Sequence, residues 1–335
     1  MNFNDIIKEI NKKVFRPVYF LHGNEAYFID VLVNHLSIAI LEPEEREFNQ
    51  TVIYGRDANM NEIVSTLKSF PMMSNYQVII LKEAQDVKDK DYELLGSYLK
   101  VPQPSSILVV AYKKQAGKRL QAMLQKHQNN VLLFESPKVS DDKLPDWIVR
   151  YLAQKQFECS PKIAQIIAGS LGNDLAKIAN ELDKLIINQT PGTAVTMDDV
   201  EANIGISKKF NVFELQTALA NHQQAKAIEI AAHFASNTRE NSIFSIIPIV
   251  YSFFEKLFVY LQLRGSMDSN SIAAEMKIRT FFLGDYQKAA RYYQLNQVLN
   301  IFKILRKYDL KAKGVDSVSP EGELIKEMIY KIVHV

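Results

Sequence analysis

Cysteine is almost absent from this chain of 335 residues, which contains only Cys159. One cysteine cannot form an intramolecular disulfide or a cysteine metal cluster, so a reducing compartment is the simplest interpretation. An excess of one charge is also lacking, because 40 Lys and Arg stand against 38 Asp and Glu, a net charge of +2. We therefore expect no general electrostatic coating of nucleic acid, although a local basic surface is compatible with this balance.

Long apolar runs are missing as well. The N-terminus has no basic segment followed by an apolar block, so we predict no signal peptide. The most apolar stretch, residues 241–254, contains Pro248 and ends at Glu255 after 14 residues. A membrane span needs roughly 18 or more. The six histidines lack H-x-x-x-H spacing, so no metal site is expected. A cytoplasmic protein without a membrane partner is predicted.

The first part of the chain alternates short β-rich apolar runs with segments of helical spacing. This alternation predicts βαβ units and a parallel sheet, with strands buried on both faces. The predicted strands are residues 18–21, 51–54, 77–81, 107–111 and 131–134, and the clearest helical segments are residues 27–41 and 61–68.

After Pro137 the pattern becomes helical, and no strand is predicted. Ser160 before Pro161 is typical of a helix start, and Asn173 is predicted to cap the next helix. Thr196 and Asp199 resemble a capping box. A second helical block is predicted at residues 212–220, 223–235, 243–263, 295–310 and 321–333.

These patterns predict three domains. An α/β domain occupies residues 1–138, a small helical domain residues 139–208, and an all-helical domain residues 209–335. The predicted fold class is therefore α/β followed by all-α.

The first predicted strand runs into a turn at Gly23 and then a helix, where the P-loop of an ATPase would lie. A P-loop has the form G-x-x-x-x-G-K-[ST], because backbone N–H groups cradle phosphate and the Lys neutralises it. Counted from Gly23, the required Gly, Lys and Ser/Thr positions hold Phe28, Ile29 and Asp30. We interpret Gly23 as a plain strand-to-helix turn.

The third predicted strand ends in Lys82 and Glu83. A Walker B strand ends in acidic residues that organise Mg²⁺, and here Lys82 takes the Asp position. The sheet therefore resembles an ATPase scaffold without its catalytic groups. No catalytic, cofactor-binding or metal-binding residue is predicted.

Five segments, in order along the chain, resemble the delta subunit of the bacterial DNA polymerase III clamp loader. The third segment, residues 171–185, is the most specific. The segments are PVYFLHGNEAYF at residues 17–28, FPMMSNYQVIIL at 70–81, LGNDLAKIANELDKL at 171–185, FNVFEL at 210–215 and LRKYDLKAKG at 305–314.

The resemblance implies a degenerate AAA+ (P-loop NTPase-like) domain, a helical lid domain and a C-terminal helical collar. It implies a non-catalytic component of the DNA-directed DNA polymerase III holoenzyme that binds and opens the sliding clamp during DNA replication. The implied partners are the beta sliding clamp, ATPase subunits of tau or gamma type, a delta-prime-type subunit, and primed DNA bound without sequence specificity.

The family places an apolar pair that enters a clamp pocket at the position of Met72 and Met73. These residues, with Phe70, are the predicted clamp-binding residues. The alternative is that both methionines pack beneath the turn, and Phe70 is also interpreted as the core anchor of this turn.

Two other functions remain open from the residues alone. The chain could be an active AAA+-type ATPase with a divergent phosphate loop, against which Ile29 and Lys82 argue. It could also be a helical adaptor that holds a complex together without clamp contact. The basic cluster in residues 112–130 fits either a surface facing DNA or a solvated helix face, and the cluster in residues 303–313 fits a solvated face or a collar contact.

Overall fold

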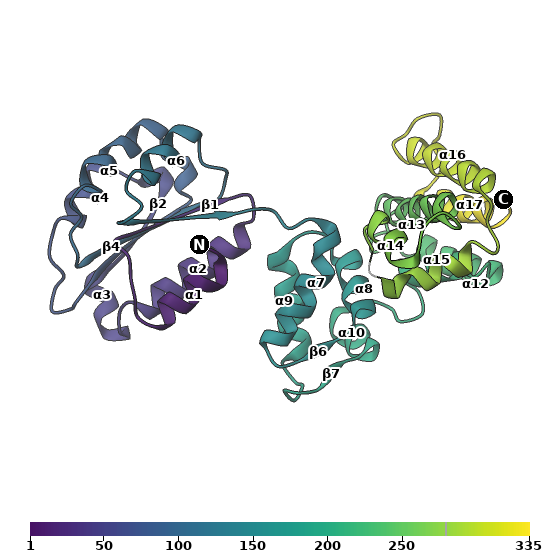
Figure 1. Ribbon diagram of the computed structural model, residues 1–335, viewed down its shortest axis with the longest axis horizontal. Helices are drawn as coiled ribbons and strands as arrows, with labels where there is room; N and C mark the ends of the chain where they lie inside the picture. The colour runs from purple at the N-terminus through teal and green to yellow at the C-terminus, as the bar shows by residue number, and fades with distance from the viewer. Residues whose placement is uncertain (279) are drawn as a thin grey trace. The chain divides into compact units, whose positions relative to one another are not determined.

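The chain forms two compact units, Met1–Ser140 and Asp141–Val335 (Figure 1). The computed structural model describes residues 1–278 and 280–335. Each unit has its own hydrophobic core. A further division of the second unit near residue 208 stays a prediction.

The first unit is built on a five-stranded parallel sheet, in the order β2-β3-β4-β1-β5. In the central pairing, Val18 lies beside Leu108 on one side and Val131 on the other. The strands are β1 (Val18–Gly23), β2 (Gln50–Tyr54), β3 (Gln77–Lys82), β4 (Ser106–Tyr112) and β5 (Val131–Ser136), so all five predicted strands are confirmed.

The prediction that every strand is buried on both faces is wrong for β2. Val52 and Tyr54 are 44% and 52% exposed, whereas β4 is buried along its whole length. β2 lies at one edge of the sheet, with β3 as its one neighbour, and its side chains are left uncovered there, whereas β5 at the other edge is mostly buried.

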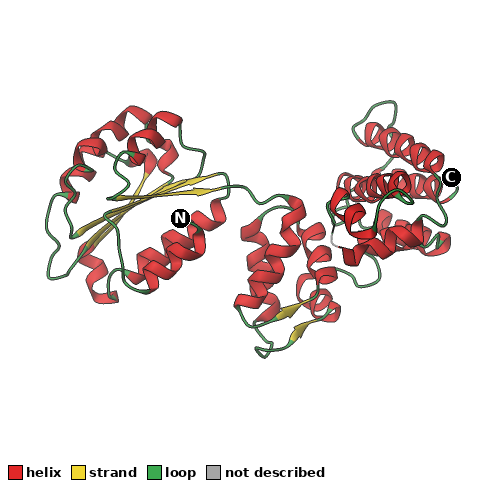
Figure 2. Cartoon of the chain, viewed as in Figure 1, coloured by secondary structure: helices red, strands yellow, loops and turns green. Residues whose placement is uncertain are grey.

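Helices cover both faces of this sheet (Figure 2). Ile6 and Ile29 lie in one core layer with Tyr19 of β1, and Met60 and Leu95 lie in the other with Phe20. Consecutive strand residues point to opposite faces, which explains the two layers. The helices are α1 (Phe3–Asn11), α2 (Ala26–Ala39), α3 (Arg46–Asn49), α4 (Met60–Leu67), α5 (Glu93–Tyr98) and α6 (Lys118–Gln125).

The second unit begins with four helices and one small strand pair. The pair was not predicted, because two residues per strand are too few to give an alternating pattern. The elements are α7 (Leu144–Gln154), β6 (Glu158–Cys159), α8 (Pro161–Leu171), α9 (Leu175–Ile186), β7 (Ala194–Val195) and α10 (Met197–Ile204).

Two of the three predicted helix caps in this region are confirmed. The Ser160 side chain accepts a hydrogen bond from the backbone N–H of Ile163, and Thr196 forms a capping box with Asp199. The prediction for Asn173 is wrong, because Asp174 caps α9 and accepts from the N–H of Lys177 at 3.0 Å. The Asn173 amide instead donates to the Asp141 carboxylate at 2.5 Å.

The remaining helices share one large apolar core. The five predicted helices are confirmed, and two helices of seven residues each were missed because so short a segment shows little periodicity. The helices are α11 (Val212–Ala220), α12 (Gln224–Ser236), α13 (Ile243–Leu263), α14 (Ser269–Glu275), α15 (Leu283–Ala289), α16 (Leu295–Ala312) and α17 (Glu321–Val333).

Helix α13 is long and apolar enough to cross a membrane by length and composition, with 21 residues and a mean hydropathy of 1.6. The uncharged run of 14 residues at 241–254 is shorter than this helix, which has the predicted bounds 243–263 and continues through Glu255 and Lys256. Eight of its side chains, including Phe253 and Phe254, are buried in the core of the unit. The same test is passed by α2 taken together with the bent segment Pro43–Asn49. Core helices pass this test too, and α13 packs here as one.

Candidate functional site

The turn after β1 is closed against its neighbours. The backbone N–H of Gly23 donates to the Lys114 carbonyl at 2.9 Å, and that of Glu25 donates to the Ser136 carbonyl at 3.1 Å. Gly23 has a φ of 135°, and a Cβ there would overlap the Ser136 backbone. A phosphate loop needs such N–H groups for its ligand. In this turn protein carbonyls already accept from two of them, which confirms a strand-to-helix turn.

The positions of the P-loop Lys and Ser/Thr have other roles. Ile29 is fully buried and lies in the core beneath the sheet. Asp30 forms an ion pair with Lys113, whose Nζ lies 2.9 Å from its Oδ1. One position is thus a core residue and the other carries a negative charge, so neither can bind phosphate.

Lys113 joins two carboxylates at the carboxyl edge of the sheet. Its Nζ lies 3.0 Å from Oε1 of Glu83, besides its contact with Asp30. Gln85 donates from Nε2 to Glu83 at 2.7 Å and accepts from the backbone N–H of Lys113 at 2.9 Å. The surviving acidic residue of the Walker B position is therefore held by an ammonium group of the chain itself. We call Asp30, Lys113 and Glu83 the ion triad.

The pKa values of Glu83 and Lys113 reflect these contacts. Hydrogen bonds from Gln85 and then Lys113 lower the pKa of Glu83 below its ordinary value of 4.5. Burial lowers the pKa of Lys113, but its hydrogen bonds to Asp30 and Glu83 outweigh burial, and the net shift is upward from 10.5. Both groups are thus charged at neutral pH. Lys113 lies in the basic cluster predicted at residues 112–130, but its pairing with these carboxylates was missed because only the strand order brings the end of β4 beside the end of β3.

We expect Glu83→Gln to lower the melting temperature at pH 7 and to have no effect in acid. Because the folded-state pKa of Glu83 is depressed, its stabilising effect is present above pH 4.5 and is lost as the pH falls through the lower folded value. Thermal melting of both proteins from pH 7 to pH 3 measures the difference. Glu44→Gln, at an exposed glutamate, is the matched control. A difference that is constant across this range would contradict the assignment.

The loop between α4 and β3 exposes all three predicted clamp-binding residues. Met73 is 98% exposed, Phe70 81% and Met72 61%. The alternative that the methionines pack beneath the turn is therefore wrong, and so is the prediction that Phe70 anchors the turn in the core. Leu67, fully buried, fills the core below this turn instead.

Two buried amides hold the backbone of this loop. Asn49, 5% exposed, accepts from the Met72 N–H at 2.7 Å and donates to the Met72 carbonyl at 2.9 Å. Gln77 donates to the carbonyls of Thr66 at 2.9 Å and Ser69 at 2.6 Å. The apolar side chains thus project from a fixed backbone. Sequence reasoning missed the roles of both residues, because Asn49 directly precedes the exposed strand β2, Gln77 begins β3, and their partners lie elsewhere in the chain.

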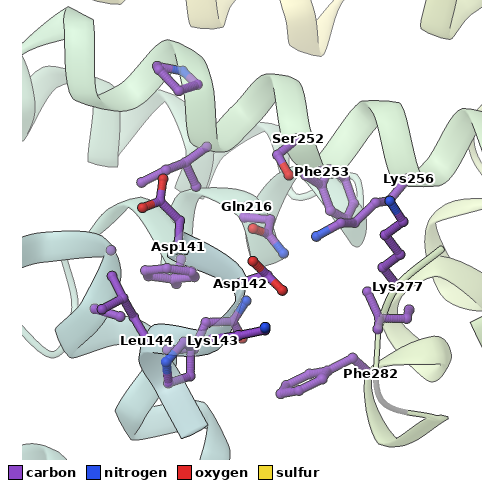
Figure 3. A pocket seen from close by; sticks show the side chains of 18 of the residues that line it. Asp141, Asp142, Lys143, Leu144, Gln216, Ser252, Phe253, Lys256, Lys277 and Phe282 are labelled. Carbon is purple, nitrogen blue, oxygen red and sulfur yellow. The ribbon is translucent and has the colours of Figure 1, made fainter. Parts of the chain in front are cut away.

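A hollow of about 1050 Å³ lies within the second unit, lined by parts of α7, α8 and α13. Figure 3 shows the Asp142 carboxylate turned toward Gln216, with Lys256 and Lys277 farther along the same hollow. Burial lowers the pKa of Lys256, opposed by the charges of Glu255 and Asp142. The lining mixes both signs of charge, which favours no one class of ligand. Among the described residues, no three His, Cys, Asp or Glu are grouped to hold a metal ion.

These features define a class of protein, a parallel α/β unit with the phosphate-loop position closed, joined to a helical unit. A family model described as DNA polymerase III, delta subunit, matches residues 19–118, and the model of the C-terminal domain of that subunit matches residues 209–324. The DNA polymerase III subunit delta of Bacillus subtilis is 22% identical over 322 residues, covering 92% of this chain and 91% of that protein.

The solved structure of the Bacillus subtilis DNA clamp loader delta protein (YqeN) has a similar fold. It matches over 100% of both chains with a TM-score of 0.55 and 20% identity. The chain therefore belongs to the DNA polymerase III delta subunit family, and so to the components of DNA replication.

Proposed function

We propose that this chain is the non-catalytic subunit that binds and opens the sliding clamp, the beta subunit, with Met72, Met73 and Phe70 as its contact residues. The observation that carries the proposal is the exposure of three large apolar side chains on one loop whose backbone is fixed by Asn49. Exposed apolar groups on a preorganised backbone are typical of binding hot spots. Methionine is unbranched and polarizable, so it can fill an irregular pocket.

Opening requires binding energy rather than chemistry. A clamp is a closed ring, and a module that binds the sprung ring better than the closed ring shifts the population toward the open form. The closed turn at Gly23 and the ion triad support a subunit that does this without binding nucleotide itself. ATPase subunits of tau or gamma type and a delta-prime-type subunit would be its partners in the loader. The complex would act on primed DNA in the cytoplasm, and residues 209–335 would form its collar contact.

We expect the purified chain to capture the sliding clamp of the same organism with equal affinity in the presence and absence of ATP and Mg²⁺. The affinity of the chain for surface-immobilised clamp is measured at fixed ionic strength. ATP turnover by the chain is measured in parallel. The physical reason is that the contact loop precedes β3 whereas the closed turn follows β1, so they lie at opposite ends of the parallel strands. The closed turn offers no phosphate cradle.

The two alternatives give different results. An active ATPase would hydrolyse ATP, and Glu83→Gln would abolish the turnover. An adaptor without clamp contact would ignore the clamp while still assembling with the other loader subunits. Either outcome would overturn the proposal.

A further inference from the structure

We propose that the clamp-docking surface has a second segment, helix α3, in which Phe48 supplies a further apolar contact and Asn49 is the positioning residue for Met72. This inference rests on the proposed function. It extends the surface to a segment that lies at least 23 positions before Met72 in the chain. Phe48 is 68% exposed, whereas Asn49, the next residue, is 5% exposed. One segment thus presents a large apolar side chain to solvent beside a buried amide.

The Asn49 amide pairs with both polar groups of the Met72 backbone. Its Oδ1 accepts from the Met72 N–H at 2.7 Å, and its Nδ2 donates to the Met72 carbonyl at 2.9 Å. The same Nδ2 also donates to the Glu45 carbonyl at 3.1 Å. An amide that pairs with both backbone groups of one residue fixes the position and the direction of that residue. Met73 follows at a φ of 52°, a left-handed conformation that an unsupported loop would rarely keep.

Helix α3 is itself anchored on its other side. Arg46 donates from Nη2 to the Ile38 carbonyl at 3.0 Å and from Nε to the Leu41 carbonyl at 3.2 Å. These bonds tie α3 to the end of α2, so the helix is fixed between α2 and the contact loop. Because α3 is fixed in this way, Asn49 can hold the Met72 backbone in place.

Phe48 is close enough to share one partner with the methionines. Standard bond lengths and the 2.7 Å hydrogen bond place the Cα atoms of Phe48 and Met72 within roughly 12 Å of each other. Side chains of this size can span such a distance on one binding surface, since protein interfaces of ordinary size bury about 800 Å² on each partner. The partner that contacts Phe48 is therefore the same sliding clamp that the methionines bind, because Asn49 joins α3 directly to the contact loop.

The test is a double-mutant cycle measured by affinity for the purified sliding clamp. We expect Phe48→Ala to weaken binding about tenfold, and Asn49→Ala to weaken it by a similar factor. In a background with both Met72→Ala and Met73→Ala, the effect of Asn49→Ala should shrink to about twofold, because the residue acts through the loop. Phe244→Ala, at a Phe that is 50% exposed in the second unit, is the matched control and should change nothing.

A second measurement separates positioning from folding. Hydrogen exchange at the Met72 amide should be slow in the native chain and fast in Asn49→Ala. Urea unfolding of each variant shows whether the unit remains folded. If Asn49→Ala does not fold, the exposed Phe48 still tests the surface, because its substitution removes no core contact.

The outcomes separate the two proposals. If the native chain ignores the clamp, or if Met72→Ala with Met73→Ala leaves binding intact, the proposed function fails. If the methionines matter and neither Phe48→Ala nor Asn49→Ala weakens binding, this inference alone is overturned. An equal effect of Asn49→Ala in both backgrounds would also overturn the positioning role.

Discussion

Replacing Met72 and Met73 together by Ala should weaken binding to the sliding clamp by roughly 30-fold to 1,000-fold. Burying one Met side chain from water contributes about 1.5–3 kcal/mol, and the Ala left behind keeps part of it. A loss of about 2–4 kcal/mol for the pair corresponds to that range, at about 1.4 kcal/mol for each factor of ten. Met73 should account for the larger part, because it is 98% exposed against 61% for Met72.

The global stability of the chain should not change with this substitution. Both side chains face solvent, and the Met72 hydrogen bonds to Asn49 are made by backbone atoms that Ala retains. Urea unfolding should therefore give the native midpoint. Ile187→Ala, at an apolar side chain that is 75% exposed in the second unit, should leave both affinity and stability unchanged. Equal clamp affinity of the native and the double variant would refute the docking role of this loop.

The sheet was predictable because its strands are short apolar runs that repeat in alternation with helical segments. All five strands appear where the pattern places them. The edge position of β2 was not predictable, since the run at residues 51–54 resembles those of buried strands and the order β2-β3-β4-β1-β5 is a property of the tertiary fold. Edge and centre differ in neighbours, not in local sequence.

The candidate site was predictable only in part. Spacing from Gly23 identified Ile29 and Asp30 as unsuited to phosphate, but nothing local linked Asp30 and Glu83 to Lys113. The same limit hid Asn49, whose partner Met72 lies 23 residues away. Phe70 was also interpreted as the core anchor of its turn, yet Phe70 is 81% exposed and Leu67 is the buried residue there. Contacts between distant segments decide such cases, and one sequence does not reveal them.

Restoring the P-loop lysine by Ile29→Lys should unfold the first unit rather than create a nucleotide site. Ile29 is fully buried in the core that packs α2 against the sheet. An unpaired ammonium group in such a place costs several kcal/mol, and the apolar contacts of Ile are lost as well. The free energy of unfolding of a domain is about 5–15 kcal/mol, so this substitution would remove most of it. Urea unfolding followed by circular dichroism measures the loss.

Ile38→Lys is the matched control, because it puts the same side chain on the same helix at a position that is 63% exposed. Exposed substitutions usually change stability by no more than about 0.5 kcal/mol. Neither variant should bind ATP, since the N–H groups of Gly23 and Glu25 still donate to protein carbonyls. A stably folded Ile29→Lys that binds ATP with Mg²⁺ would mean that the turn can open around phosphate, and the active ATPase would again be the better interpretation of this edge.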